Sequence, residues 1–222
     1  MNSTIQLDLP LNNIVKKSED GADSSPSIFF LHGFGSNMQD LFGLAPFFGK
    51  DWTCVSLQGT IPVQYNGWAW AELDYENIGK LPKPEQMQIH QKKVLQSIKK
   101  SIELLNLNPK KINLLGFSQG ASLSIYTALK NSEYFSSVVA LCGFFPVNQV
   151  KEVLALEAVK ELNLFIANGR MDPVIPISLG HSTRDGLMDL GVKLDYHEYD
   201  CEHTISDDCL RDVMAWVRKK NQ

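Results

Sequence analysis

Residues 112–120 read Ile-Asn-Leu-Leu-Gly-Phe-Ser-Gln-Gly, an apolar run that leads into Ser118. A Gly-x-Ser-x-Gly pattern at the end of a buried strand is typical of a nucleophile elbow, a strained strand-to-helix turn that exposes the serine Oγ. Small residues at 121–129 follow and predict a helix that packs closely on a sheet. The alternative is a glycine-bounded turn in which Ser118 only caps that helix. The strand, turn and helix context favours a catalytic serine.

Strand-like and helix-like segments alternate along the chain, and most of the strands are continuously apolar. Such strands between amphipathic helices predict a mainly parallel sheet that is covered by helices on both faces. No internal repeat or linker divides the sequence, so we expect residues 1–222 to form a single domain. The expected strands are residues 27–31, 52–57, 112–117, 137–141, 162–167 and 192–199, and the expected helices are residues 37–48 (interrupted at Pro46), 85–105, 119–130, 147–159, 177–190 and 206–219.

The charge distribution argues against nucleic acid as a partner. The formal net charge is −4, and the basic residues are scattered. Lysines at 92–93 and 99–100 gather on an expected amphipathic helix, which is typical of a solvated helix face. We therefore expect no binding to DNA or RNA. His90 lies on the same helix, and we expect its side chain to be exposed to solvent.

Cysteine and histidine spacing gives no sign of a metal site. No Cys-x-x-Cys pair occurs, and the five histidines form no metal-binding pair, so we expect neither a metal nor another cofactor. The first residues lack the basic and apolar regions of a signal peptide, and no apolar run is long enough to span a bilayer. A reduced, cytoplasmic protein without stable membrane insertion is expected, with a disulfide between Cys201 and Cys209 left open.

A serine hydroxyl becomes a good nucleophile when a base takes its proton and a third group holds that base. In α/β hydrolases these groups follow in the order serine, acid, histidine, on loops at one edge of the sheet. Asp172 follows the expected strand 162–167, and His203 follows the expected strand 192–199. Each residue taken alone could be a turn or surface residue. Their order favours Ser118, Asp172 and His203 as a catalytic triad.

Other titratable residues are weaker candidates for these roles. His181 lies within an expected helix and His197 within an expected strand, whereas a catalytic base belongs on a loop. Asp200 and Glu202 lie too close to His203 in the sequence to be the favoured acid.

Acyl transfer also requires donors for the tetrahedral oxyanion. The backbone N–H of Gln119, directly after the serine, is one expected donor. The other comes from the loop after the first core strand, where two glycines flank Phe34 and let its N–H point inward. A plain glycine-rich turn is the alternative for this loop, in which His32 has a packing role.

Four segments together resemble the phospholipase/carboxylesterase family of α/β hydrolases, which includes acyl-protein thioesterases. They are residues 31–35 (Leu-His-Gly-Phe-Gly), 116–120, 169–176 (Gly-Arg-Met-Asp-Pro-Val-Ile-Pro) and His203. The resemblance extends over about residues 27–217. It implies an α/β-hydrolase fold with a mainly parallel central sheet, helices on both faces and a minimal lid. It also implies Ser118, Asp172 and His203 as the triad, Phe34 and Gln119 as oxyanion donors, and Trp70, Phe144 and Val174 as the lining of an acyl-binding groove.

The chain departs from the thioesterase pattern around the groove. Residues 70–72 are Trp-Ala-Glu, where the thioesterase pattern resembles Trp-Phe-Asp. Residues 143–146 are Gly-Phe-Phe-Pro, where that pattern resembles Cys-Trp-Leu-Pro. Asn168 stands in place of a histidine. No departure removes a catalytic group. We expect the aromatic loop 61–83 to cover the site, and the bulky Phe144 and Phe145 to limit the groove to short or medium acyl chains.

The expected activity is hydrolysis of carboxylic esters or thioesters through an acyl-enzyme, without a cofactor. A peptidase or amidase on the same fold is an alternative, as is a non-catalytic binding module. A dienelactone hydrolase is disfavoured, because the elbow carries Ser118 where such an enzyme has cysteine. The expected partner is a small ester or thioester substrate. The sequence leaves the oligomeric state open, a homodimer included.

Overall fold

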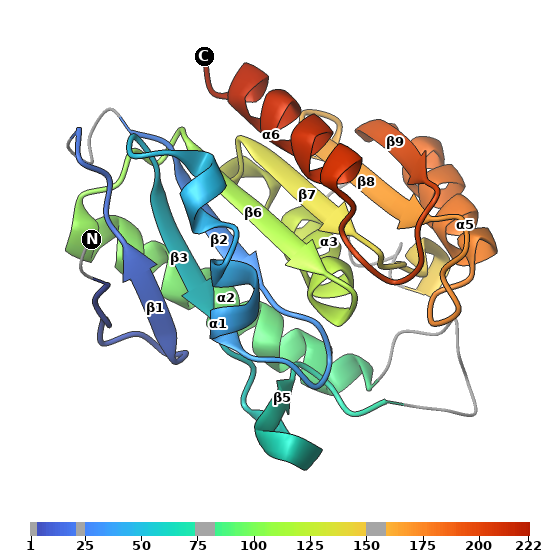
Figure 1. Ribbon diagram of the computed structural model, residues 1–222, viewed down its shortest axis with the longest axis horizontal. Coiled ribbons are helices and arrows are strands. Elements are labelled where there is room, and N and C mark those ends of the chain that lie inside the picture. Colours follow the sequence, from blue (N-terminus) through green and yellow to red (C-terminus); the bar gives the residue numbers. More distant parts are fainter. Residues whose placement is uncertain (1–3, 21–24, 74–82, 150–158) are drawn as a thin grey trace.

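A seven-stranded sheet, with strand order β1-β3-β2-β6-β7-β8-β9, forms the centre of the computed structural model (Figure 1). The structure describes residues 4–20, 25–73, 83–149 and 159–222. Strand β1 pairs antiparallel with β3, and every other neighbouring pair is parallel. The mainly parallel sheet expected from the sequence is confirmed. The strands are β1 (Asn13–Lys16), β2 (Ser27–Leu31), β3 (Thr53–Leu57), β6 (Ile112–Phe117), β7 (Ser137–Leu141), β8 (Asn163–Gly169) and β9 (Lys193–Tyr199).

Helices cover both faces of this sheet (Figure 1). Helices α1 (Met38–Phe42) and α6 (Asp207–Lys220) lie on one face. Helices α2 (Pro84–Leu105), α3 (Gln119–Lys130) and α5 (Ile177–Asp189) lie on the other. Among the described helices, none has the length and apolar character that a membrane crossing requires.

Two hydrophobic clusters, one on each face, explain why the strands are apolar throughout. Along β2, Ile28 and Phe30 belong to the cluster under α1 and α6, whereas Phe29 and Leu31 belong to the cluster under α2, α3 and α5. Successive side chains of a strand point to opposite faces, so a sheet that is covered on both faces has no polar alternation.

The helix ends follow the capping residues of the sequence. Ser206 accepts a hydrogen bond from the backbone N–H of Cys209 and begins α6, as expected. The segment 37–48 is broken: α1 ends at Phe42, and a 3-10 helix (Ala45–Phe48) follows with Pro46 in its first turn, where a missing N–H costs nothing. Of the helix expected at 147–159, only a 3-10 turn (Val147–Gln149) and Val159 are described, and the rest lies outside the described residues.

A small hairpin projects from the sheet near the carboxyl ends of the parallel strands (Figure 1). It consists of β4 (Ile61–Val63), a 3-10 turn (Gln64–Asn66) and β5 (Gly67–Ala69). Two backbone hydrogen bonds tie it to the loop after β2: the Trp68 N–H donates to the carbonyl oxygen of Ser36, and the Gly35 N–H donates to that of Trp68. The hairpin belongs to the aromatic loop 61–83, of which residues 74–82 lie outside the described residues.

The start of α3 lies so close to the sheet that it tolerates only glycine. A Cβ atom on Gly120 would lie 2.0 Å from the carbonyl oxygen of Leu31 in β2. A Cβ on Gly116, at the end of β6, would lie 2.1 Å from the carbonyl oxygen of Gly120. Both glycines of the Gly-x-Ser-x-Gly pattern are therefore required by this close approach.

Gly120→Ala should lower the free energy of unfolding by about 1–3 kcal/mol or more, because the new methyl group meets backbone that cannot move aside. Urea denaturation measures the change. Gly43→Ala is the matched control, because its Cβ would meet one atom within 4 Å, the carbonyl oxygen of Asp40 at 3.1 Å. If both variants unfold at the same urea concentration, the close approach does not constrain the elbow.

Candidate active site

Ser118 occupies a strained turn between β6 and α3. Its backbone has φ 54° and ψ −118°, a conformation that residues other than glycine rarely adopt. Its N–H donates to the carbonyl oxygen of Leu141, 2.8 Å away, at the end of β7. The neighbouring strand therefore holds the turn through this hydrogen bond.

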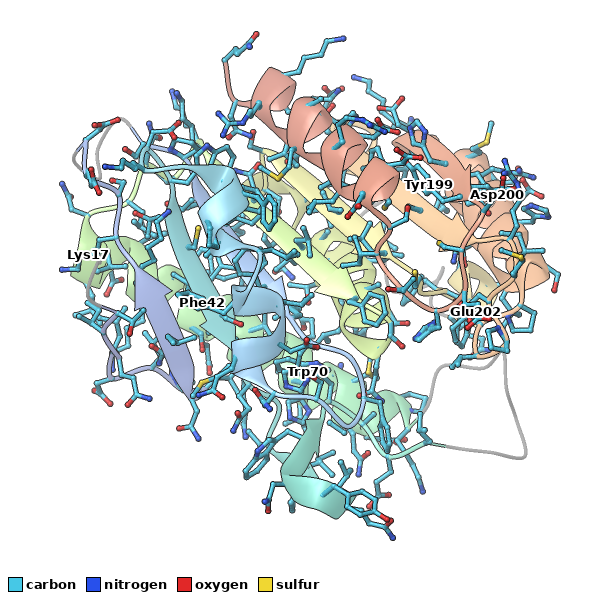
Figure 2. All side chains as sticks on the ribbon, viewed as in Figure 1. Lys17, Phe42, Trp70, Tyr199, Asp200 and Glu202 are labelled. Carbon is cyan, nitrogen blue, oxygen red and sulfur yellow. The ribbon has the colours of Figure 1, made fainter. Side chains whose placement is uncertain are left out.

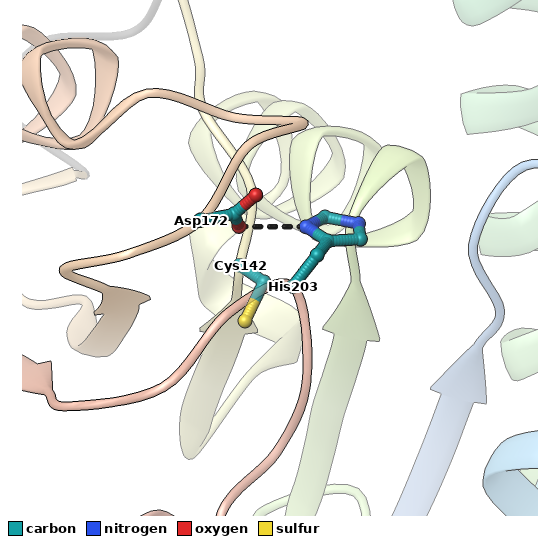
Figure 3. A group of neighbouring side chains, drawn as sticks. All are labelled: Cys142, Asp172 and His203. Carbon is teal, nitrogen blue, oxygen red and sulfur yellow. Dashed lines mark hydrogen bonds and ion pairs between the residues drawn. The ribbon is translucent and has the colours of Figure 1, made fainter.

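His203 connects Ser118 to a buried carboxylate. Its Nε2 lies 3.0 Å from the Ser118 Oγ, and its Nδ1 lies 2.7 Å from Oδ2 of Asp172. The second hydrogen bond is drawn in Figure 3. The other oxygen of Asp172 accepts hydrogen bonds from the backbone N–H groups of Val174 and Ile175, at 2.8 and 2.9 Å. A carboxylate held in this way fixes the orientation of the imidazole.

The three residues come from separate loops at the carboxyl ends of the parallel strands. Ser118 follows β6, Asp172 follows β8, and His203 follows β9. Parallel strands bring their carboxyl ends to the same edge of a sheet, which is where ligands bind in open α/β sheets. The structure therefore brings together the three residues that sequence order suggested.

The rival residues have other partners. Asp200 pairs with Arg170 at 2.6 Å and, together with Glu202, lies on the loop after β9 (Figure 2). The His181 imidazole pairs with Glu198 at 2.7 Å. His197 stacks on the ring of Phe165, with 4.6 Å between the ring centres.

Phe34 and Gln119 flank Ser118 with backbone donors. In residues 4–20, 25–73, 83–149 and 159–222, neither the N–H of Phe34 nor that of Gln119 meets a hydrogen-bond acceptor. Gln119 is the first residue of α3, where backbone N–H groups have no partner within the helix. Both residues line the same cavity as Ser118, so both N–H groups are free to serve a bound group beside the serine.

The Gln119 side chain has a separate role, because it binds the segment that follows the hairpin. Its Oε1 accepts from the backbone N–H of Trp70 at 2.8 Å, and its Nε2 donates to the carbonyl oxygen of Ala71 at 2.7 Å. The indole N–H of Trp70 donates to the carbonyl oxygen of His32 at 2.7 Å. These bonds tie the loop after β2, the hairpin and the start of α3 together around Ser118.

A cavity of about 230 Å³ opens over Ser118. Phe144 and Val174, two of the three residues expected in the groove, lie in its wall. Trp70 differs from the expectation: it is fully buried and does not line this cavity, because its ring packs between His32 and His90. The cavity is lined by Phe34, Leu73, Ser118, Gln119, Ser122, Phe144, Val174, Ile175 and His203.

Sequence reasoning missed Leu73, Ser122 and Ile175 as lining residues. Ser122 could have been found, because it lies in the first turn of α3, the helix that begins directly after Ser118. Ile175 lies within the segment that carries Asp172, where backbone bonds to the carboxylate direct the chain. Phe145, expected near the groove, is buried instead and stacks on Tyr126.

His90 is buried, so the expectation of an exposed side chain is wrong. Its Nδ1–H donates to the carbonyl oxygen of Gln86, 3.1 Å away, and its Nε2 accepts from the backbone N–H of Thr60, 3.2 Å away. The position lies on the inner face of α2, beneath Trp70. His32 is buried as well, and its Nε2 accepts from the N–H of Gly59 at 3.0 Å. Burial lowers the pKa of both His32 and His90.

The four cysteines are free thiols, so the disulfide that the sequence left open between Cys201 and Cys209 is not formed. Cys142 follows β7 and lies beside the Asp172–His203 pair (Figure 3). Burial raises the pKa of the Cys142 thiol to about 12. This thiol is therefore protonated near neutral pH and does not compete with Ser118 as a nucleophile.

The protein should lose stability in mild acid, because His32 and His90 are held neutral when folded. Their lowered pKa values mean that the unfolded chain binds more protons below about pH 6.5, so the free energy of unfolding falls as the pH decreases. The slope of the free energy of unfolding against pH approaches about 1.4 kcal/mol per pH unit for each histidine. Urea denaturation between about pH 5 and pH 7 measures it.

His90→Gln tests the source of this slope, because an amide can still accept from Thr60 but does not titrate. The variant should show a shallower pH dependence than the wild type below about pH 6.5, and the same dependence just above pH 7, where a free histidine is neutral. An unchanged slope in His90→Gln would show that another group causes the acid sensitivity.

Comparisons with known proteins agree with this fold and assign the chain to a family. The structure resembles the carboxylesterase from Mesorhizobium loti with a TM-score of 0.83 at 20% identity, over 98% of this chain and 99% of that one. It resembles esterase PE8 with a TM-score of 0.78 at 25% identity, over 92% of this chain and 96% of that one. The fold is therefore that of the α/β hydrolases.

The sequence profile of the phospholipase/carboxylesterase family matches residues 12–221, and the chain belongs to this family. Acyl-protein thioesterase 1 of Debaryomyces hansenii is 31% identical over 122 residues, which are 54% of this chain and 53% of that protein. The chain thus spans about half the length of such curated relatives.

Proposed function

We propose that this protein is a serine hydrolase that cleaves carboxylic esters or thioesters through an acyl-enzyme. The observation that supports this most is the hydrogen-bonded chain from Ser118 through His203 to Asp172, at 3.0 and 2.7 Å. A binding module that had kept only the hydrolase fold would be expected to have lost at least one of these groups. Membership of the phospholipase/carboxylesterase family supports the same activity.

In the proposed mechanism, the Ser118 Oγ attacks the carbonyl carbon of the substrate while His203 Nε2 takes its proton. The N–H groups of Phe34 and Gln119 donate to the oxyanion that forms. His203 then protonates the leaving alcohol or thiol, which leaves an ester on Ser118. A water molecule gives a proton to His203 and attacks this ester, and His203 then returns that proton to the Ser118 Oγ as the free acid departs. Asp172 stays ionised and holds the imidazole throughout.

We propose that the acyl group binds in the cavity over Ser118 and is of short or medium length. The cavity volume, about 230 Å³, is below the range of about 300–1,000 Å³ that is typical of small-molecule sites. Its wall carries the Phe144 ring together with Leu73, Val174 and Ile175. These apolar side chains suit an alkyl chain and offer no charge to a polar substrate.

We further propose that residues 1–222 act as one catalytic domain in the cytoplasm and need neither metal nor cofactor. The sheet draws its strands from almost the whole chain, between Asn13 and Tyr199. The four free thiols suit a reducing compartment. A net charge of −4 supports the expectation that nucleic acid is not a partner.

Asp172→Asn should reduce kcat for a p-nitrophenyl ester by several orders of magnitude. An amide in place of the carboxylate favours the wrong tautomer of His203, and the corresponding loss in a serine protease is about 10⁴-fold. Steady-state kinetics measures the loss, and thermal unfolding checks that the variant folds. Asp200→Asn is the matched control, because Asp200 follows the same strand as His203 and pairs with Arg170. If Asp200→Asn is crippled while Asp172→Asn retains its rate, the acid is wrongly assigned.

Catalytic efficiency should rise with acyl length and then level off or fall within the medium range. Each methylene that finds apolar wall gains about 0.8 kcal/mol, and the gain stops where the cavity ends. A series of p-nitrophenyl and thioester substrates from acetyl to palmitoyl gives kcat/KM at each length. A kcat/KM that keeps rising up to the palmitoyl substrate would contradict the proposal that the cavity limits the acyl group to short or medium length.

A further inference from the structure

Two thiols converge on the loop that carries His203. The Cys142 Sγ, directly after β7, lies 3.3 Å from the carbonyl oxygen of Thr204. The Cys201 Sγ, on the loop after β9, lies 3.6 Å from the same oxygen. Both sulfur atoms therefore contact one backbone oxygen, directly after His203 in the chain. The proposed hydrolysis uses neither thiol.

The first of these thiols forms a ligand set with the acid–base pair. The Cys142 Sγ, a carboxylate oxygen of Asp172 and a ring nitrogen of His203 all lie within 4.8 Å of one another (Figure 3). The nitrogen that faces Asp172 is Nδ1. Sulfur, imidazole nitrogen and carboxylate oxygen are the donors that Zn²⁺ takes in proteins.

The distances suit a tetrahedral zinc ion after a small adjustment. Zinc lies about 2.3 Å from sulfur and about 2.0–2.2 Å from nitrogen or oxygen, so neighbouring ligand atoms lie about 3.3–3.8 Å apart. The Cys142 Sγ, now within 4.8 Å of the other two donor atoms, would need to approach them by about 1 Å, whereas His203 Nδ1 and Asp172 Oδ2, now 2.7 Å apart, would need to separate by about 0.6 Å. Cys201 lies outside this group of three, but its sulfur is 3.6 Å from the Thr204 oxygen, and a rotation of its side chain toward the ion would supply a fourth donor. The Cys201 side chain is partly exposed, which gives an ion a route from solvent.

We propose that Cys142, Cys201, Asp172 and His203 form an inhibitory zinc site, in which bound Zn²⁺ switches off the hydrolase reversibly. The inhibitory part of this inference rests on the proposed function. The metal is a regulator in this proposal and takes no part in catalysis.

The inhibition follows from the tautomer of His203. The neutral imidazole carries one proton, and zinc on Nδ1 moves it to Nε2. Nε2 then has no lone pair for the Ser118 proton, so the serine is not activated. Zinc also occupies the Asp172 carboxylate that held the imidazole. Each thiol that binds releases its proton to solvent, and no oxidation or reduction occurs. A chelator removes the ion and restores the active tautomer.

Zinc affinity, measured with ZnCl₂ by competition with a chromophoric chelator, tests the site directly. The wild type should bind one ion per chain, and Co²⁺ in its place should show a thiolate-to-cobalt charge-transfer band. Cys142→Ser and Cys201→Ser should each weaken zinc binding by at least about tenfold. Cys54→Ser is the matched control with wild-type affinity, because Cys54 is also a buried thiol near a backbone carbonyl, that of Ala45, but lies on β3.

The rate of p-nitrophenyl ester hydrolysis, measured over a range of ZnCl₂ concentrations, tests whether bound zinc inhibits the enzyme. Zinc should inhibit the wild type and EDTA should restore the rate, while Cys142→Ser, compared with its own zinc-free rate, should need at least about tenfold more zinc. Ser118→Ala should bind zinc like the wild type, which separates the zinc site from the proposed function. Wild-type affinity in Cys142→Ser, or a wild-type rate that saturating zinc leaves unchanged, would overturn the proposal. A chain that binds zinc through Cys142 but hydrolyses nothing would contradict the proposed function alone.

Discussion

The contact between the start of α3 and the carboxyl end of β2 constrains everything around Ser118. A Cβ on Gly120 would lie 2.0 Å from the Leu31 carbonyl oxygen, so the helix can begin there only with glycine at this position. Ser118, two residues before Gly120 in the turn from β6 to α3, takes φ 54°. Burial of the two apolar clusters stabilises the sheet and so maintains this strain.

The parallel sheet places the remaining groups. Because β6, β8 and β9 all end at one edge, the loops after them present Ser118, Asp172 and His203 to a common space. The loop after β2 reaches the same space with Phe34, and the Gln119 side chain holds the segment after the hairpin against it. The Cys142 thiol lies beside the Asp172–His203 pair, where a zinc ion would bind the same nitrogen and carboxylate that hold the imidazole for catalysis.

Local patterns were sufficient to predict six of the seven strands of the central sheet and the order of the site residues, but they did not predict β1 or the hairpin strands β4 and β5. Strands β2, β6 and β7 are followed by histidine, serine and cysteine, respectively, and their predicted ends agree with the structure. Side-chain direction was harder, because it depends on contacts between distant segments. Trp70 turns inward because its indole N–H finds the His32 carbonyl oxygen, and His90 is buried because Thr60 lies across from it. The roles of the triad, the oxyanion donors and the groove stay predictions.

The most direct test of the central claim is to trap the acyl-enzyme. Wild-type protein is quenched in acid during turnover of a p-nitrophenyl ester, and its peptides are analysed by mass spectrometry. We expect an added acyl group on the peptide that contains Ser118, and none in Ser118→Ala under the same conditions. Turnover with the acyl group on another residue, or an adduct that persists in Ser118→Ala, would contradict the assignment of Ser118 as the nucleophile.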